Sequence, residues 1–521
     1  MAPFSNPILP GSYPDPSICR VGSDYFLVTS SFEYFPGVPI FHSRDLVHWH
    51  QIGHVLDRPT QLNLNGLMPS RGIWAATIRH HASRFYVTTT LVLNDKQTRN
   101  FFVYADDPAG PWSDPVWING AEGIDPTLVF DGDRAYYLGN GTPAGGQQYP
   151  KHRGIWLQEI DLATGTLFGP RYHLWEGALK GAQSQEGPHL YKVGPYYYLL
   201  IAEGGTGFAH AVTVARSQSL TGPYLGYEGN PILTHRHLGR RAAITNVGHG
   251  DLVETPSGEW WMVCLASRPY GGDHRILGRE TFLVPVVWEQ GWPVVNPPKG
   301  VVELKGDAPA LAPHPWSAAP EQEDFDTARL GWEWNFLRTP REPFWSLEAR
   351  PGYLRLRLQN ESLSGLGNPS AIVRRQQHAS FAASTALEFI PQSDGEWAGL
   401  VLINGPHHFR LEYGQASGHP VVQVRAHAQG EERIVASTAL EAPRLELKVQ
   451  AQGPLYSFFY RHGSAWVALA NNVDGTLLSM DSVQGFVGAY LGLFVVAESD
   501  GVESVADFDW FCYQGLDFDH G

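Results

Sequence analysis

Three acidic residues lie at equivalent points of the sequence, and their type suits proton transfer. Asp15 in "YPDPSI", Asp125 in "GIDPTLVFD" and Glu186 in "SQEGPHLY" each precede a strand-like apolar run. Because Pro16 follows Asp15, we expect an extended backbone at Asp15. Buried carboxylates cost several kcal/mol unless they are paired or hydrogen-bonded. Three buried carboxylates in one place would not stabilise a fold, so three converging acids would indicate a site for general acid–base chemistry.

These acids belong to a pattern that occurs five times in the N-terminal part of the chain. Each unit has a lead residue, a short strand, a polar turn and a second strand whose aromatic pair starts ten or eleven positions after the lead. Units of about 50 residues that begin with a hairpin are typical of β-propeller blades. The first strand of each blade lines the central channel, so we expect the lead residues to meet around one axis. They are Asp15, Trp74, Asp125, Glu186 and His249.

The repeated strands and turns predict an all-β protein. We expect two domains, because 521 residues exceed the roughly 250–300 residues of a single core. We assign residues 1–303 to a five-bladed β-propeller and residues 304–323, rich in Pro and Ala, to a linker. Residues 324–521 return to short alternating strands, which predicts an antiparallel β-sandwich. Its expected role is a stabilising wall, a sugar-binding module or a loop that completes a pocket. One large sandwich with coincidental aromatic pairs is the alternative fold.

Composition and charge limit the classes of partner. The chain has 52 acidic and 37 basic residues and a formal net charge of −15, which argues against nucleic acid and an anionic membrane surface. No apolar run approaches the ~18–20 residues of a membrane span, and the N-terminus lacks the basic and apolar regions of a secretion signal. Cys19, Cys264 and Cys512 lie far apart in apolar contexts, as buried free thiols do. We therefore expect a cytoplasmic protein.

The ordered motifs resemble those of a known enzyme family. "YPDPSI", "GIDPTLVFD", "SQEGPHLY", "VGHGDLVET" and "LGRET" occur in the order seen in glycoside hydrolase family 43, in particular its β-xylosidase and α-L-arabinofuranosidase members. "SSFEYFPGVPIFHSRDLVHWHQIGHVL" is similar to the matching stretch of those xylosidases, and "LGWEWNF" and "ADFDWFCY" extend the resemblance to the C-terminal part. The resemblance covers essentially the whole chain and implies a concanavalin-like sandwich.

The resemblance also implies roles for the three acids. Asp15 would be the general base, Glu186 the general acid, and Asp125 the residue that orients Glu186 and raises its pKa. Hydrolysis of an acetal needs one ionised carboxylate to deprotonate water and one protonated carboxyl for the leaving oxygen. Neighbouring negative charges raise the pKa of a carboxyl. The family inverts the anomeric configuration, which requires roughly 6.5–9.5 Å between acid and base.

Four further residues have both a functional and an ordinary interpretation. By the resemblance, Phe32 and Trp74 form the wall of the sugar pocket; otherwise they are core aromatics. Arg279 would reach a sugar hydroxyl and Asp125, although a paired arginine is the commoner case. His249 would lie beside a calcium ion on the propeller axis, completed largely by waters; a hydrogen-bonded core histidine is the ordinary alternative.

A pocket closed in this way accepts one terminal sugar, which implies exo action. We expect release of β-D-xylose, with α-L-arabinofuranose alongside, from xylo-oligosaccharides or arabinoxylo-oligosaccharides. An enzyme acting mainly on α-L-arabinofuranosides is the close alternative. The resemblance also implies a dimer or tetramer, which is typical of such enzymes. Two other classes stay open: a non-catalytic sugar-binding propeller, and a five-bladed hydrolase of fructose polymers, which would retain configuration.

Overall fold

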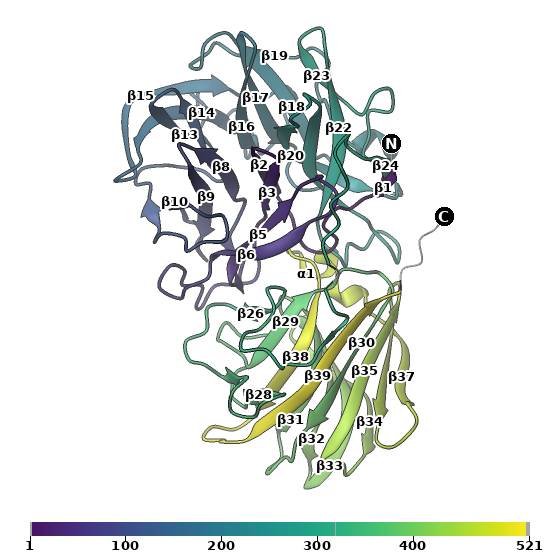
Figure 1. Cartoon of the computed structure of the whole chain (residues 1–521). Helices are drawn as coiled ribbons and strands as arrows, with labels where there is room; N and C mark the ends of the chain where they lie inside the picture. Colours follow the sequence, from purple (N-terminus) through teal and green to yellow (C-terminus); the bar gives the residue numbers. More distant parts are fainter. Residues whose placement is uncertain (1–2, 318, 517–521) are drawn as a thin grey trace.

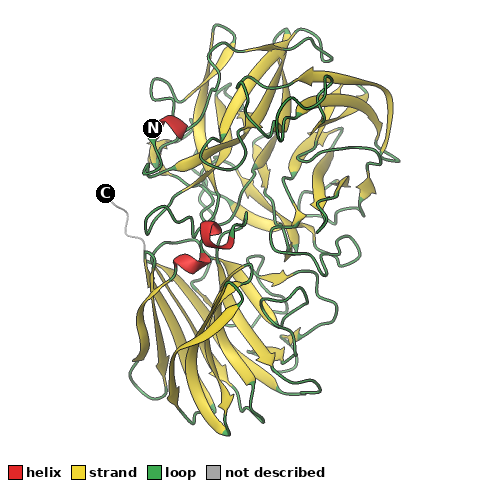
Figure 2. Cartoon of the chain, turned by 180° about the vertical axis from the view of Figure 1, so that it is seen from behind, coloured by secondary structure: helices red, strands yellow, loops and turns green. Residues whose placement is uncertain are grey.

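The computed structural model describes residues 3–317 and 319–516, and nearly all regular structure in them is β-strand. Two bodies are joined end to end, a propeller built by the first three hundred or so residues and a sandwich built by the rest (Figure 1). The described helices are single turns: η1 (Arg236–Leu238), η2 (Thr476–Leu478) and α1 (Met480–Val483). Figure 2 shows η2 and α1 where the two bodies meet. Among the described residues, no helix is long and apolar enough to cross a bilayer.

The propeller has five blades, as the repeated pattern predicts. Each blade is an antiparallel sheet whose strands follow one another along the chain. The first blade contains β2 (Ser17–Val21), β3 (Asp24–Val28), β5 (Gly37–Ser43) and β6 (His50–Leu56). The second contains β7 (Gly72–Ile73), β8 (Thr77–His81), β9 (Arg84–Val92), β10 (Thr98–Ala105) and β11 (Val116–Trp117). The third contains β12 (Thr127–Asp131), β13 (Arg134–Gly141), β14 (Gly154–Asp161) and β15 (Thr166–Trp175).

The last two blades complete the ring. The fourth contains β16 (Glu186–Val193), β17 (Tyr196–Glu203), β18 (Ala211–Ser217) and β19 (Leu225–Gly226). The fifth contains β20 (Thr245–Glu254), β21 (Trp260–Ser267), β22 (Glu280–Glu289) and β23 (Trp292–Val295). The first strands of the fifth and first blades, β20 and β2, lie side by side. Nearby, β1 (Pro3–Ser5) pairs with β24 (Lys305–Asp307), so the two ends of the propeller segment are held together.

The aromatic pairs explain why the sequence repeats so regularly. Each pair lies near the start of the second strand of its blade, and in the first two blades one ring contacts the next blade. Phe26 packs edge-on against Phe85 with ring centroids 5.1 Å apart, which joins the first blade to the second. Tyr86 and Phe130 lie 5.3 Å apart and join the second blade to the third. Aromatic rings are large enough to fill the wedge between twisted sheets, and such pairs add about 0.5–1.5 kcal/mol beyond their buried area.

A buried carboxylate ties the blades together at the axis. Asp251, in "GHGDL", accepts hydrogen bonds from Ser17 Oγ at 2.7 Å and Tyr191 Oη at 2.5 Å, and it pairs with Arg79 Nη1 at 3.0 Å. Burial opposes its charge, but Arg79 above all lowers the pKa of Asp251 far below its ordinary value. These partners come from the first, second and fourth blades. Asp251 therefore has a structural role, and its contacts show what a compensated buried acid requires.

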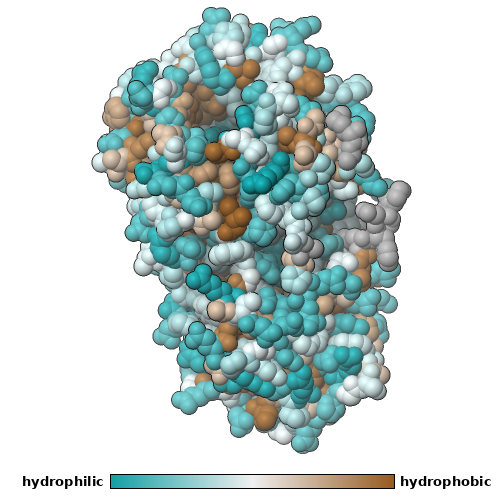
Figure 3. Space-filling model, in the orientation of Figure 1, coloured by the Kyte–Doolittle hydropathy of each residue, from teal (hydrophilic) through white to brown (hydrophobic). Residues whose placement is uncertain are grey.

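The C-terminal sandwich consists of two antiparallel sheets that pack face to face (Figure 1). One sheet contains, in spatial order, β27 (Trp345–Ser346), β28 (Leu354–Arg357), β39 (Val505–Gly515), β30 (Phe381–Glu388), β35 (Arg444–Gln452), β36 (Leu455–Arg461) and β37 (Val467–Asp474), and β25 (Gln322–Glu323) also pairs with β39. The other contains β34 (Glu431–Ala439), β33 (His419–Ala428), β32 (His407–Ala416), β31 (Glu396–Asn404), β38 (Tyr490–Ala497), β29 (Ala371–Arg375), β26 (Asn335–Leu337) and β4 (Tyr34–Phe35). The visible face of the sandwich is mainly hydrophilic (Figure 3).

Strand β4 belongs to the propeller segment, yet it is an edge strand of the sandwich. Tyr34 and Phe35 pair with Leu337 and Phe336 of β26. The ring of Tyr34 also stacks on Tyr490 of β38, with centroids 3.8 Å apart. One continuous apolar cluster extends from the first two blades into the sandwich. The segment 304–323, predicted as a linker, contributes the short strands β24 and β25, one at each of its ends.

Candidate active site

The backbone at Asp15 differs from the expectation. Pro16 should favour an extended Asp15, yet its φ is 58°, in the left-handed region. Asp125, which also precedes a proline, has a φ of 56°. A non-glycine residue held in this region costs on the order of 1–3 kcal/mol, and such positions cluster at functional sites. The tertiary contacts of the carboxylate outweigh the local preference, because Asp15 is fixed by an arginine from the fifth blade.

Asp15 is a buried carboxylate that stays ionised. It is 5% exposed, and its Oδ1 accepts a 2.7 Å bond from Arg279 Nη1. Ser30 Oγ donates to Oδ2 at 2.6 Å. Burial raises the pKa of Asp15, but the charge of Arg279 and the Ser30 hydrogen bond outweigh it and bring the pKa below its ordinary value. The side chain is therefore a base that has lost its proton well before neutral pH.

Glu186 and Asp125 have the opposite tendency. Glu186 is the first residue of β16, and Asp125 lies two residues before β12, so both face the axis from neighbouring blades. Burial, followed by the negative charge of Asp15, raises the pKa of Glu186 to about 7. Burial and the charges of Glu186 and Asp15 raise the pKa of Asp125 well above its ordinary value. The Asp125–Glu186 pair consequently retains a proton near neutrality.

Arg279 is the cation around which the three acids gather. It is 2% exposed, and besides Asp15 it donates through Nη2 to the carbonyl of Phe486 at 3.3 Å. The resemblance led us to expect contact with Asp125. In the structure the guanidinium hydrogen-bonds Asp15, and it acts on Asp125 through its charge, which lowers the pKa of that carboxyl. Arg279 therefore keeps Asp15 ionised, whereas at Asp125 and Glu186 burial and the neighbouring negative charges outweigh it and raise the pKa.

An aromatic wall borders the acids. Phe32 and Trp74 lie with ring centroids 6.4 Å apart, and both contact Phe486, at 6.3 and 5.4 Å. Phe486 comes from the loop between α1 and β38 of the sandwich. Its amide donates to Ser70 Oγ at 2.9 Å, which fixes this loop on the propeller. Of the three roles left open for the sandwich, these contacts favour the third, because a loop of the sandwich contributes Phe486 to the wall.

Replacing Phe486 with Ala tests this contribution. We expect kcat/KM to fall about tenfold, mainly through KM, because one side of the sugar pocket loses its apolar face. Phe459→Ala in β36 is a matched control, since it removes a partly buried phenylalanine of the same domain. Steady-state kinetics and a thermal melt of both variants provide the comparison. Unchanged kinetics of Phe486→Ala would mean that the loop only joins the domains.

His249 lies at the axis, as its place in the repeat predicts. It is 6% exposed, and its Nδ1 is 3.9 Å from Asp15 Oδ1. Calcium prefers roughly six to eight oxygen ligands. In the part of the chain that the structure describes, no three His, Cys, Asp or Glu side chains form a group that could hold a metal ion. Protein ligands alone do not make a calcium site here, so the ion stays a prediction and the reaction below does not use it.

Two more histidines reach the axis, and the sequence assigned neither a role. Arg79 Nη2 donates to His189 Nδ1 at 2.7 Å, and His210 Nδ1 is 3.0 Å from the carbonyl of Asn246. Burial lowers the pKa of both histidines to about 3. Burial also lowers the pKa of His249. These imidazoles are neutral at physiological pH, so the charge that balances Asp15 comes from Arg279.

The fold and site define a class of protein. The site combines an ionised carboxylate, a carboxyl that keeps its proton near neutrality and an aromatic wall. A glycoside hydrolase needs this combination of a base, an acid and an apolar face for the sugar. The model of glycosyl hydrolases family 43 matches residues 4–293, and that of the beta xylosidase C-terminal concanavalin A-like domain matches residues 322–514. The chain belongs to glycosyl hydrolase family 43. The family, the hydrolase class and the propeller-plus-sandwich fold predicted from the sequence are thus confirmed.

Relatives and solved structures match along the whole chain. A xylosidase/arabinosidase of Butyrivibrio fibrisolvens is 42% identical, over 97% of this chain and 98% of its own. A non-reducing end α-L-arabinofuranosidase of Bacteroides ovatus is 40% identical, over 99% of this chain and 95% of its own. The crystal structure of a xylan β-1,4-xylosidase from Bacillus halodurans superposes with a TM-score of 0.92 at 38% identity, covering 98% of this chain and 100% of that one.

Proposed function

We propose that the enzyme releases β-D-xylose from the non-reducing ends of xylo-oligosaccharides, with inversion of configuration, and that it also releases α-L-arabinofuranose. One observation supports this most directly: Asp15 is biased toward the ionised form and Glu186 toward the protonated form within one site. The names of the relatives support the two sugars, since one is a xylosidase/arabinosidase and another an α-L-arabinofuranosidase.

The proposed reaction is one displacement. Asp15 takes a proton from a water molecule as its oxygen attacks the anomeric carbon on the face opposite the leaving group. Glu186 gives its proton to the glycosidic oxygen as the bond from that oxygen to the anomeric carbon breaks. Asp15 ends protonated, Glu186 ends ionised, and solvent restores both. Arg279 orients Asp15 through the 2.7 Å bond, and Asp125 keeps the proton within the acid pair.

The aromatic wall supports exo action, because the rings of Phe32, Trp74 and Phe486 pack together beside Arg279 and offer one apolar face to a terminal sugar. The test is side-by-side kcat/KM on 4-nitrophenyl β-D-xyloside and 4-nitrophenyl α-L-arabinofuranoside, with NMR of the first anomer released. Hydrolysis with inversion is the expected result. Binding without cleavage would favour the sugar-binding propeller, and retention with fructosyl substrates would favour the fructan hydrolase.

The pH dependence follows from the two pKa directions. The base must be ionised, and Arg279 lowers the pKa of Asp15, so activity persists below the ordinary value of 3.8. The acid must be protonated, and burial raises the pKa of Glu186 to about 7, so activity is lost as pH rises through that value. We therefore expect kcat/KM on xylobiose to decline above about pH 7. A profile still rising at about pH 9 would contradict the assignment of Glu186 as acid.

The arabinofuranoside preference has a separate basis. The Bacteroides ovatus relative carries that activity in its name, so an enzyme acting mainly on α-L-arabinofuranosides is the second candidate. A ratio of the two kcat/KM values below one, xyloside over arabinofuranoside, would establish it. The dimer or tetramer stays a prediction of the resemblance, and light scattering measures it directly.

A further inference from the structure

A pocket lies next to the general acid, and its lining does not include the aromatic wall. Its volume is about 400 Å³, and its lining includes Lys151, Ser184, residues 204–209 and Arg240. Lys151 comes from the loop between β13 and β14, Ser184 and residues 204–209 come from the loops around β16 and β17, and Arg240 comes from the segment after η1. Sites for small ligands commonly have volumes of about 300–1,000 Å³. The pocket is therefore large enough for a sugar with a substituent.

The pocket is fixed relative to Glu186 by the backbone. Ser184 lies two residues before Glu186, and its amide donates to the carbonyl of Lys151 at 2.9 Å. The charge of Lys151 reaches the acid, since it is among the groups that lower the pKa of Glu186. A general acid contacts the oxygen that joins the terminal sugar to its leaving group. A pocket that adjoins the acid, apart from the wall of the terminal sugar, is placed to receive the leaving group.

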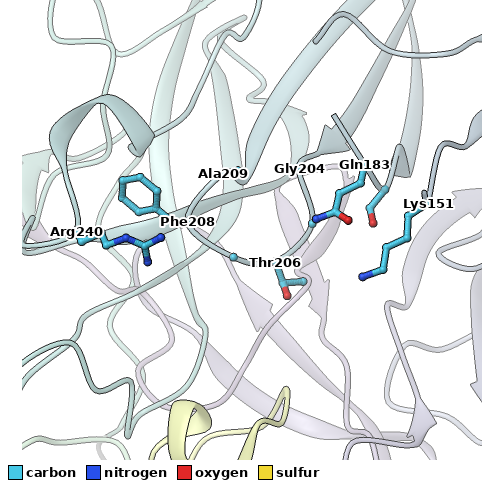
Figure 4. Close-up of a pocket in the computed structure, with 10 residues that line it drawn as sticks. Lys151, Gln183, Gly204, Thr206, Phe208, Ala209 and Arg240 are labelled. Atoms are coloured by element: carbon cyan, nitrogen blue, oxygen red, sulfur yellow. The ribbon is translucent and has the colours of Figure 1, made fainter. Parts of the chain in front are cut away.

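The chemistry of this pocket is cationic. In Figure 4 the side chains of Lys151 and Arg240 extend toward the same space from opposite sides, with Thr206 between them. The Arg240 guanidinium lies 4.8 Å from the ring centroid of Phe208. Among the described residues, neither Lys151 nor Arg240 has a carboxylate within 4.0 Å. Two unpaired cations in one pocket are notable in a chain with 52 acidic and 37 basic residues.

We propose that this pocket binds a carboxylate on the leaving group, so that the enzyme prefers oligosaccharides whose sugar next to the cleaved bond carries a uronic acid. The inference rests on the proposed function, because it assigns the leaving-group side of the same site. Lys151 and Arg240 pair with the carboxylate, Phe208 offers an apolar face to the sugar ring, and Thr206 offers a hydroxyl.

The test compares xylobiose with xylobiose whose reducing-end xylose carries a glucuronic acid. At low salt we expect kcat/KM to be about tenfold higher for the acidic substrate, since each exposed charge pair adds a modest factor. The advantage should shrink to about twofold in roughly 0.5 M salt, where exposed charges are screened. The readout is the ratio of the two kcat/KM values, because Lys151 also affects the acid. Lys151→Met with Arg240→Gln should bring this ratio to about one.

Matched controls lie beside both cations. Lys180→Met and Arg241→Gln remove exposed charges from nearby segments without changing the lining of the pocket. They should preserve the preference. Equal kcat/KM values in the wild-type enzyme, or a ratio unchanged by the double variant, would overturn the proposal.

Failure of the proposed function would appear differently, as no hydrolysis of either xylobiose or the arabinofuranoside. In that case calorimetry tests the pocket, by comparing the affinity of the wild-type protein for plain xylobiose with its affinity for xylobiose that carries a glucuronic acid. Tighter binding of the acidic compound, lost in the double variant, would support the pocket. Equal or undetectable binding of both compounds would overturn it.

Discussion

Asp15→Asn should lower kcat/KM about 10⁴-fold on every substrate, whatever its leaving group. The amide is close in size to the carboxylate, but it cannot take a proton from water. The loss should therefore be the same for xylobiose and for an aryl xyloside with a good leaving group. Steady-state kinetics on both substrates measures it. Activity within about tenfold of the wild type would remove Asp15 as the base.

The structure dictates the controls for this variant. Asn at position 15 leaves the buried Arg279 without its anionic partner, so stability will fall as well. A thermal melt separates unfolding from lost chemistry. Asp114→Asn serves as the neutral comparison, because that carboxylate is 78% exposed and forms only a surface pair with Arg58. Asp251→Asn is the opposite comparison, since it should destabilise the propeller.

Glu186→Ala should separate substrates by their leaving groups. Xylobiose needs a proton on its departing oxygen, so kcat/KM should fall by about 10³-fold or more. A dinitrophenyl β-xyloside departs as a stable anion, so its loss should stay within about tenfold. The ratio of the two losses is the diagnostic quantity, measured at a pH below the pKa of about 7 that Glu186 has in the wild type.

Two results decide this prediction. Equal losses on the two substrates would contradict the role of Glu186 as acid, because a general collapse of the site affects both. Glu176→Ala is a suitable control, since this exposed glutamate lies ten residues before Glu186 in the chain and pairs with His152 at 3.6 Å. It should leave both kcat/KM values nearly unchanged.

Much of the fold and the acid trio could be predicted because their signals are local. A strand, a turn and an aromatic pair occupy a dozen consecutive residues, and the repetition of that unit sets the five blades. The lead position of each unit then places Asp15, Asp125 and Glu186 at the axis. Residue type alone does not identify a catalytic acid, because Asp251 is an acid on the same axis whose role is structural.

The rest depends on contacts between distant parts of the chain. Phe486 enters the site from a loop that the sequence separates from Arg279 by 207 positions. Only a glycine-flanked phenylalanine in "QGFVG" marks it, and this is a common pattern. The left-handed Asp15 could not be foreseen either, because the local effect of Pro16 points the other way. Tertiary contacts with Arg279 and Ser30 decide that conformation.

Strand β4 has a consequence for protein engineering. Tyr34 and Phe35 complete a sheet of the sandwich, and Phe486 of the sandwich packs on Phe32 of the propeller. Neither domain can therefore be transferred to another protein by itself. A swap of sandwiches between relatives would have to carry the β4 dipeptide and its partner β26 as one block. Recombination at the proline-rich junction alone would leave β26 without its partner β4 and the aromatic wall without a matching Phe486. We expect such a hybrid to lose both stability and activity.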